Sequence, residues 1–295
     1  MKISVANYQL VSKVKSSKFN VDHLNRYELC FLIGQDCFQF SVFDTKSSSC
    51  LLLEDYHFHS SPSNEAFRSA LTALFENHHL LNAGFWKSVK LVFRNGKYAF
   101  IPTPLFDKNV IGDYLSLNNR LNARLDQPHY YRHDQINMAN VFVAKKDLVQ
   151  WFQSIYPNLT PHIVHHSSAI IEGIQRQEGK TRSRSMSLFV RDQELDIMVS
   201  SIDQFEYFNR FQFANDKTMI KYVLMVMKEH NLDPNLCQVQ LWGDLNPKSS
   251  KFEILYRFIR NISFGSRPSK LDFTFEFDEI EDHRYFDLLS SFYCQ

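Results

Sequence analysis

The sequence predicts an α/β fold that is built twice from one succession of elements, so that two lobes have mixed sheets flanked by helices. Residues 185–244 read as three consecutive strands, a helix and a strand that ends at a glycine, and the same order recurs in residues 29–93. The polar stretch 175–184 separates the copies and is the best candidate for a linker. A chain of 295 residues suits two domains of about 150 residues each. We therefore expect lobes at residues 1–178 and 183–295.

The first copy begins after a stretch without strong periodicity, residues 1–27, which we expect to pack as a lead-in against the first lobe. Apolar runs with tight polar turns between them predict three antiparallel strands at 28–34, 37–45 and 51–58. Ser63 or Asn64 can cap the following helix, which we expect to end near Asn82 and to cover the sheet.

A hairpin is predicted next, because Asn95-Gly96 tolerates the positive φ angles of a type I′ turn. Its strands are Val89–Phe93 and Tyr98–Ile101. The remaining elements of the first lobe are, in order, a short helix 107–117, strands near 130–132 and 140–144, a helix 146–156, a short strand beginning at 163 and a helix 167–176.

In the second copy, three strands form a meander, with apolar residues at 188–190, 197–199 and 205–213. Asn215 and Asp216 supply a helix cap, and strand 238–244 follows that helix. We expect a helix after Pro247, a strand 271–277 and a closing helix over 285–292. The acidic cluster 278–282 precedes this last helix, and we interpret it as electrostatic capping.

Composition excludes several classes of protein. Thirty-three basic and thirty-two acidic residues give a net charge of +1, which lacks the positive field of a nucleic-acid-binding protein. Five cysteines without a C-x-x-C pair indicate buried reduced thiols and a cytoplasmic location. No run reaches the roughly 18 apolar residues of a membrane span, and the N-terminus lacks the pattern of a signal peptide, so we expect no membrane insertion.

The duplicated order of elements resembles the ribonuclease H-like domains of the actin, hexokinase and heat-shock-chaperone superfamily, and among them the PilM-type proteins of type IV pilus assembly. The run Leu29–Asp44, the aromatic-rich strands and the length are similar to the Bacteroidetes family called domain of unknown function 3822. The resemblance covers nearly the whole chain. It implies the actin-like ATPase fold.

The resemblance also implies where nucleotide would bind. In the superfamily, the loop between the first two strands of each lobe reads approximately Asp-x-Gly, where the carboxylate organises Mg²⁺ and the glycine admits phosphate. In this chain the first loop is Leu32-Ile33-Gly34, with leucine at the acidic position. The second is Phe189-Val190-Arg191, with phenylalanine at the acidic position and arginine at that of the glycine. Both departures argue against ATP and Mg²⁺ as cofactors.

Two further features bear on a ligand. Asp36 and Asp192 lie near these loops. If the chain aligns with the superfamily pattern in a shifted register, they would substitute for the lost carboxylates; alternatively they are turn residues, since aspartate is common in turns between strands. The family's adenosine pocket follows a strand ending in Gly-Gly, where this chain has Trp242-Gly243. The Trp242 ring would either stack on a planar ligand or belong to a core or interface. A small ligand would bind in a cleft between the lobes bounded by Gly34, Arg191 and Gly243.

Other chemistry finds little support. Twelve histidines occur without acidic or cysteine partners at zinc-ligand spacing, and no nucleophile elbow, P-loop or dinucleotide fingerprint is present. We therefore assign no catalytic and no metal-binding residues. Two hypotheses remain. The first is an actin-like protein that does not hydrolyse ATP and serves as a scaffold for a protein partner. The alternative is an ATPase or sugar-kinase-like enzyme that uses Asp36, Asp44, Asp192 or Asp196.

Overall fold

The computed structural model describes residues 8–58, 64–177, 183–201 and 204–295, which form two compact units. The first unit comprises Met1–Gly173, Lys270–Glu279 and Asp287–Gln295, and the second comprises Ile174–Ser269 and Ile280–Phe286. Two segments near the C-terminus therefore belong to the first unit. Residues 178–182 of the expected linker lie outside the described residues, and the lobe boundaries at 178 and 183 stay a prediction.

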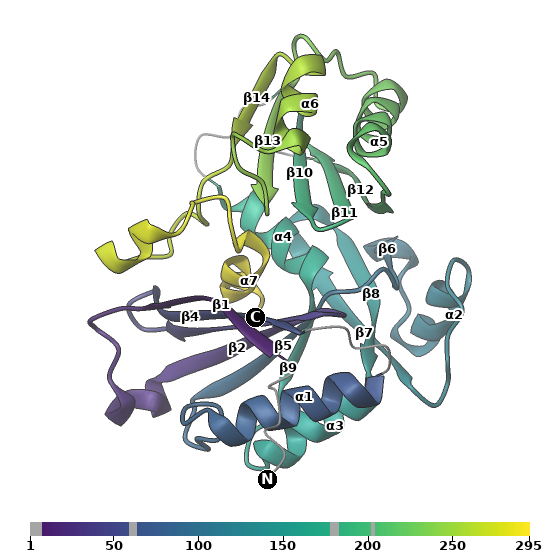
Figure 1. The fold of residues 1–295 in the computed structure, drawn as a ribbon. Helices are drawn as coiled ribbons and strands as arrows, with labels where there is room; N and C mark the ends of the chain where they lie inside the picture. The colour runs from purple at the N-terminus through teal and green to yellow at the C-terminus, as the bar shows by residue number, and fades with distance from the viewer. Residues whose placement is uncertain (1–7, 59–63, 178–182, 202–203) are drawn as a thin grey trace. The chain divides into compact units, whose positions relative to one another are not determined.

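The first unit contains a six-stranded sheet with the order β1-β4-β3-β2-β5-β9 (Figure 1). The neighbouring pairs β1–β4, β4–β3 and β3–β2 are antiparallel, whereas β5 runs parallel to β2 and β9 runs parallel to β5. Their bounds are β1 Tyr8–Lys15, β2 Tyr27–Ile33, β3 Cys37–Asp44, β4 Ser49–Phe58, β5 Ser88–Phe93 and β9 His162–His165. The antiparallel strands expected after residue 27 are confirmed.

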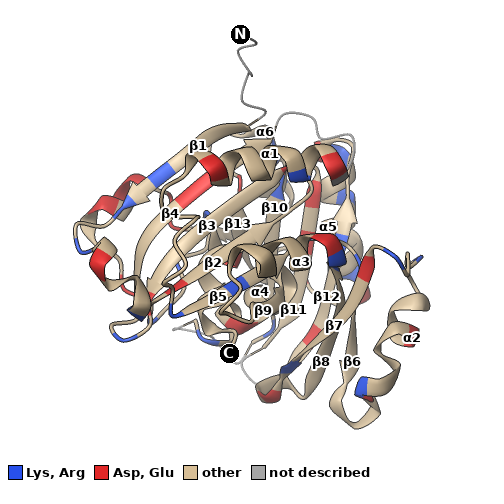
Figure 2. Cartoon of the chain, turned by 90° about the horizontal axis from the view of Figure 1, so that it is seen from below, with Lys and Arg blue, Asp and Glu red and all other residues tan. Residues whose placement is uncertain are grey.

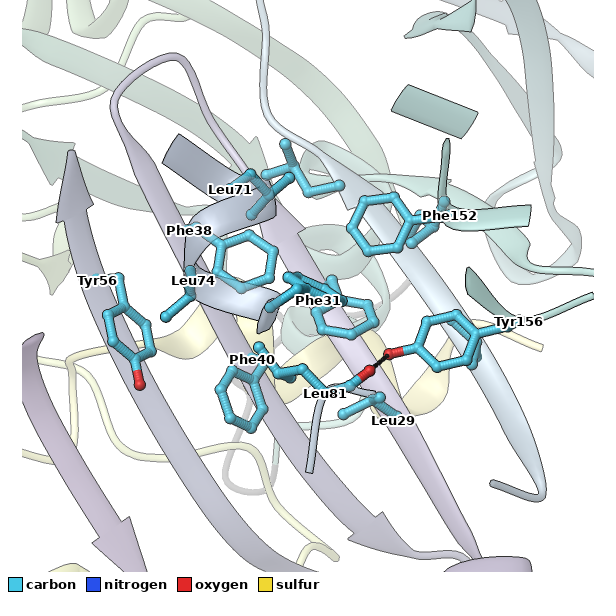
Figure 3. Packing of buried hydrophobic residues seen from close by; sticks show 14 of the residues in the cluster. Leu29, Phe31, Phe38, Phe40, Tyr56, Leu71, Leu74, Leu81, Phe152 and Tyr156 are labelled. Carbon is cyan, nitrogen blue, oxygen red and sulfur yellow. Dashed lines mark hydrogen bonds between the residues drawn. The ribbon is translucent and has the colours of Figure 1, made fainter. Parts of the chain in front are cut away.

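Aromatic side chains fill one face of this sheet (Figure 3). Phe31 of β2 lies at the centre, with its ring 5.4 Å from that of Phe38 and 5.0 Å from that of Phe152. Helices α1 (Asn64–Asn77) and α3 (Lys146–Ile155) cover this face, as Figure 1 shows. The hydroxyl of Tyr156 donates a hydrogen bond to the carbonyl of Leu81 at 2.6 Å, which satisfies the polar end of a fully buried ring.

The second unit repeats the pattern. Its five-stranded sheet has the order β12-β11-β10-β13-β14, which matches β4-β3-β2-β5-β9 in both order and strand direction. The predicted duplication is therefore confirmed. The strands are β10 Ser185–Arg191, β11 Glu194–Ser200, β12 Phe205–Gln212, β13 Gln238–Gly243 and β14 Asn261–Phe264, and the helices are α5 Asp216–Glu229 and α6 Ser250–Phe258. The side chain of Asn215 caps α5 by accepting from the N–H of Thr218, as expected.

A small three-stranded sheet, with the order β6-β8-β7, also belongs to the first unit. Its strands are β6 Tyr98–Pro102, β7 Asp126–His133 and β8 Met138–Lys145, and helix α2 (Ile111–Ser116) packs against them. Helix α4 (His166–Gln175) follows β9 and crosses the boundary between the units after Gly173.

The hairpin predicted at Asn95-Gly96 is wrong. Strand β5 pairs with β2 and β9 in the large sheet, whereas β6 pairs with β8 in the small one. Neither Asn95 nor Gly96 has a positive φ, and the Asn95 side chain instead accepts from the N–H of Lys97 at 2.8 Å. An Asn-Gly pair indicates only that the backbone can adopt a tight turn. It does not show whether the two flanking strands pair with each other or with other strands.

Near the chain ends, the lead-in packs against the first unit and a closing helix is present, as expected, whereas two other expectations are corrected. Part of the lead-in is strand β1, which pairs with β4 at the edge of the sheet. Instead of a strand 271–277, the chain has an isolated bridge at Asp272 and the 3₁₀ helix η5 (Phe275–Glu279). The closing helix is α7 (Phe286–Ser290) followed by η6 (Ser291–Tyr293), and its first turn contains Asp287 rather than the acidic cluster 278–282. The capping role that we assigned to the cluster is therefore not supported.

Candidate functional site

The first candidate loop is a tight turn between β2 and β3. The N–H of Gly34 donates to the carbonyl of Cys37 at 2.9 Å, and the carbonyl of Asp36 accepts from the N–H of Phe58 at 2.8 Å. The Asp36 side chain is exposed, and Gly34 does not have a positive φ. The turn thus uses its own backbone groups to join three strands. Leu32, where the superfamily resemblance implies a carboxylate, is fully buried.

The second candidate loop joins β10 to β11. Phe189, at the acidic position of this loop, pairs with Trp242 on the neighbouring parallel strand β13. The two rings are stacked with centroids 5.1 Å apart and an interplanar angle of 13°, and Phe286 contacts both of them. A carboxylate at residue 189 would therefore lie within an aromatic cluster rather than in water.

Trp242 is a core residue in this structure. Its side chain is 1% exposed, and its indole N–H donates to the carbonyl of Ser266 at 3.1 Å. A Cβ on Gly265 would lie only 2.0 Å from the indole ring, so glycine is needed for this close approach. The ring consequently presents no exposed face on which a planar ligand would stack.

Gly243 ends β13 in a conformation that other residues rarely adopt. Its φ is +101°, and a Cβ there would lie 2.0 Å from the carbonyl oxygen of Val190. That carbonyl accepts from the N–H of Asp244 at 2.8 Å, while the N–H of Gly243 donates to the carbonyl of His283 at 3.0 Å. The glycine allows the chain to turn tightly over the end of β10.

A pair of arginines meets one carboxylate at this end of the sheet. Nε of Arg191 lies 3.5 Å from Oδ2 of Asp244, and Nε of Arg284 lies 3.4 Å from Oδ1 of the same residue. Asp192 adopts a left-handed turn conformation with φ 51°, and its carbonyl accepts from the ammonium of Lys251 at 2.6 Å. Arg191, at the position where the superfamily resemblance implies a glycine, therefore contacts a carboxylate.

The other carboxylates considered for catalysis have structural contacts. Asp196 is buried and binds the guanidinium of Arg210 through both oxygens, at 2.7 and 2.8 Å. Asp44 accepts from the N–H of Lys46 at 2.9 Å in the turn that follows β3. These contacts account for both side chains without a metal ion.

Sequence reasoning missed a buried polar network in the first unit. Nδ1 of His133 lies 2.7 Å from Glu172, and its Nε2 lies 3.2 Å from the hydroxyl of Ser168, to which Asn140 donates at 2.8 Å. The network has the order of a serine, histidine and acid triad. All four side chains are buried, however, and the hydroxyl already accepts from Asn140. The contacts match a role in joining β7, β8 and α4, and no sequence spacing signals them.

The described residues contain no group of three or more histidine, cysteine, aspartate or glutamate side chains that would hold a metal ion. Burial lowers the pKa of His129 and of His162, which favours the neutral form of both imidazoles. All five cysteines are buried, as the sequence predicted. Within the part of the chain that the structure covers, no helix has the length and hydropathy needed to cross a membrane.

The candidate residues thus fall into two groups. Arg191, Asp192, Trp242 and Gly243 lie together at one end of β10 and β13, and Arg284 joins them from a segment that no motif marks. Gly34 and Asp36 belong to the other unit. A cleft between the two groups stays a prediction.

Comparison with known proteins agrees with this architecture. A family model described as "Protein of unknown function (DUF3822)" matches residues 16–262. None of the curated proteins matches the chain.

Among solved structures, a Bacteroides thetaiotaomicron protein with an actin-like ATPase fold and unknown function has a TM-score of 0.77 at 18% sequence identity. The match covers 95% of this chain and 100% of that chain. The PilM–PilN type IV pilus biogenesis complex gives a TM-score of 0.61 at 10% identity, covering 89% of this chain and 96% of that one. These similarities establish the actin-like ATPase fold and confirm the prediction.

Proposed function

The chain belongs to the DUF3822 family of proteins of unknown function and has the actin-like ATPase fold, and from this premise we propose that it is a scaffold or binding protein that does not hydrolyse ATP. One observation carries the proposal. Phe189, at the position of a metal-organising carboxylate, is stacked on Trp242 inside an aromatic cluster.

The first loop supports the same conclusion. Leu32 is fully buried in the sheet, and the exposed Asp36 is four residues further along, beyond the turn glycine. Because Mg²⁺ requires oxygen ligands in near-octahedral geometry, a leucine side chain contributes nothing to it. Each lobe thus lacks the carboxylate that the resemblance assigns to its phosphate loop.

The side chain of Arg191 gives a second, separate reason to expect that the loop after β10 does not bind phosphate. A phosphate-binding glycine lets backbone N–H groups approach an oxygen, whereas Arg191 fills this position with a side chain that contacts Asp244. Since Asp244 also contacts Arg284, a phosphate would compete with a carboxylate for both guanidinium groups.

A protein partner is the remaining part of the proposal. PilM, which shares the fold, was solved in complex with PilN, a precedent for an actin-like protein that binds another protein. The net charge of +1 argues against a nucleic-acid partner, as do the basic and acidic residues that are interspersed along the ribbon in Figure 2. The five buried thiols favour a cytoplasmic location.

Thermal unfolding with and without Mg²⁺–ATP tests the nucleotide part. A ligand at 100 times its Kd stabilises the folded state by about 2.7 kcal/mol, which a thermal shift detects. We expect no saturable shift at millimolar Mg²⁺–ATP and no phosphate release above a protein-free blank. Mg²⁺ alone and ATP with a chelator are the controls. A saturable shift accompanied by phosphate release would support the divergent ATPase or sugar-kinase-like enzyme instead.

A further inference from the structure

Strand β14 forms an open edge of the sheet in the second unit (Figure 1). Within the described part of the chain it pairs with β13 and is the last strand of that sheet. The N–H of Gly265 donates to the carbonyl of Leu241 at 2.8 Å, so the backbone of Gly265 faces β13. Successive residues of a strand face opposite sides, so Ser263 also faces β13, whereas the N–H and carbonyl groups of Ile262 and Phe264 point away from it. These outward groups can pair with a further strand.

This edge lacks side chains that usually prevent an edge strand from pairing. The residues of β14, Asn261–Phe264, include no charged residue and no proline. Strand β1, at an edge of the sheet in the first unit, instead contains Lys13 and Lys15 and has a register shift after Leu10, and η5 lies beside it. Pairing with a further strand is therefore hindered at β1 and is not hindered in these ways at β14.

A row of aromatic rings from α6 lies over the same edge. The ring of Phe252 is stacked on that of Phe264, with centroids 5.0 Å apart, and the ring of Tyr256 is stacked on that of Phe252 at 5.8 Å. Helix α6 connects two parallel strands and so runs back along them, which puts Tyr256 toward the start of β14. Tyr256 is 64% exposed. Since Ile262 and Phe264 pack against the same core as Phe252, the rings lie on the helix-covered face beside the open edge.

Both ends of β14 are held in place. At its start, the side-chain amide of Asn261 donates to the carbonyl of Asn235 at 3.1 Å. At its end, the ring of His283 lies 4.4 Å from that of Phe264, and its Nε2 lies 2.6 Å from the carbonyl oxygen of Leu245. A strand fixed in this way loses little conformational entropy when another strand pairs with it.

Positive charge lies at the start of β14. Arg260 directly precedes the strand, is exposed, and forms no ion pair with the residues that the structure describes. Asp233 is also near this point, but its carboxylate accepts hydrogen bonds from Asn235. Arg257 of α6 is 69% exposed and lies 3.6 Å from Glu253, and an exposed pair of this kind is weak. A carboxylate on a bound segment would therefore find a guanidinium partner here.

We propose that an extended segment of a partner protein pairs with β14 as an added strand of this sheet. In antiparallel pairing, which is the more stable arrangement, the segment's residues opposite Ile262 and Phe264 exchange backbone hydrogen bonds with them. Directly opposite side chains share a face, so two aromatic residues of the segment, separated by one residue, pack on Tyr256 and Phe252. An acidic residue that follows them pairs with Arg260. This pairing rests on the proposed function as a binding protein and specifies its site and the form of its partner.

A synthetic peptide serves as the probe for this site. Its sequence is Thr-Trp-Thr-Trp-Thr-Glu-Glu, with blocked ends and a fluorescent label, and fluorescence anisotropy measures its binding to the full chain. We expect saturable binding with a Kd below about 1 mM. The same peptide with N-methyl groups on both tryptophan amides keeps every side chain but cannot donate to the edge, so it should bind at least about tenfold more weakly. Serine in place of both tryptophans should weaken binding to a similar extent.

Variants of the chain locate the binding. Ile262→Pro removes an N–H that points away from β13, which an edge strand tolerates, and Tyr256→Ser removes the exposed ring. Each should weaken binding of the probe at least about tenfold, whereas Met225→Ser, at a 42% exposed side chain of α5, should bind it as the wild type does. Arg260→Glu should weaken binding of the probe and favour a peptide with lysines in place of its glutamates. Circular dichroism confirms that each variant is folded.

Three outcomes overturn the proposal. The first is the absence of saturable binding up to about 1 mM probe, and the second is binding that Ile262→Pro and Tyr256→Ser leave unchanged. The third is a wild-type mass that doubles in light scattering while Ile262→Pro stays monomeric, because β14 would then pair with β14 of a second copy. Each outcome leaves the absence of ATP hydrolysis intact, since phosphate release from Mg²⁺–ATP is measured separately and would contradict the proposed function without changing where the probe binds.

Discussion

The indole ring of Trp242 and the phenyl ring of Phe189 lie stacked across two parallel strands, with centroids 5.1 Å apart. This pair holds the end of β10, where the superfamily resemblance puts a phosphate loop, within the hydrophobic interior. Phe189, where that resemblance implies an acidic residue, is therefore part of the packing that stabilises the second unit.

Replacing Phe189 by alanine should lower the free energy of unfolding by about 3–5 kcal/mol, because a buried ring is lost and a cavity is left. Chemical denaturation followed by tryptophan fluorescence measures the change. Phe85→Ala, at an exposed ring, is the control and should change the stability by less than about 0.5 kcal/mol. Equal stabilities for Phe189→Ala and the wild type would show that the ring stacking is not part of the core.

Gly243→Ala should destabilise the protein by more than about 1 kcal/mol, because its φ of +101° and the nearby carbonyl of Val190 exclude a Cβ. Gly84→Ala is the matched control, since a Cβ there meets nothing within 4 Å and its φ is not positive. We expect that control to be neutral or stabilising by up to about 1 kcal/mol. A Gly243→Ala protein with the wild-type unfolding midpoint would contradict the close approach of β13 to Val190.

Much of the fold follows from local pattern, but strand partnership does not. The runs that form β2, β3 and β4, and β10, β11 and β12, are bounded by tight turns, and their order alone predicts the duplication. Strand β1 escaped prediction because it is an edge strand with mostly exposed side chains, which have no periodicity. Residues 271–277 alternate as a strand does, yet they fold otherwise, because alternation measures amphipathicity and does not show which partner strand is available.

Some residues of the candidate site could likewise be predicted from local sequence, and others could not. Gly243 and the turn residues Asp36 and Asp192 are visible as turn chemistry in the sequence. Arg284 and Gly265 have no such signal in the sequence. Arg284 contacts Asp244 and Gly265 lies against Trp242, and in both pairs the two residues are far apart in the chain. Long-range contacts of this kind are set by tertiary packing, which leaves no local signal.

Asp126 should make stability depend on pH. Burial by itself raises the pKa of this carboxyl, but the N–H of Asn122 and the ammonium groups of Lys97 and Lys145 together lower the pKa below its ordinary value. Its contribution is thus complete above the unfolded pKa of about 3.9 and is lost as the pH falls through the lower folded value.

Asp126→Asn should therefore lower stability at pH 7 by about 1–3 kcal/mol and make it less sensitive to acid than that of the wild type. Urea denaturation at a series of pH values from 7 to about 3 measures both effects. Asp113→Asn, at an exposed residue of α2, is the control and should follow the wild-type profile. Parallel pH profiles for wild type and Asp126→Asn would show that the two lysines do not stabilise the carboxylate.

Thiol reactivity should report the burial of Cys30. Burial raises its pKa to about 12, with a smaller opposing effect from Lys90. At pH 8 the thiolate fraction is then about 10⁻⁴, against roughly 0.2 for a cysteine of ordinary pKa, so Cys30 should react more than about a thousandfold more slowly than an exposed thiol. A thiol-specific disulfide reagent should find no fast-reacting cysteine in the native chain and all five after unfolding. Phe85→Cys supplies an exposed reference thiol in the same protein. If Cys30 in the native chain reacts as quickly as this reference, the sheet opens to solvent around β2.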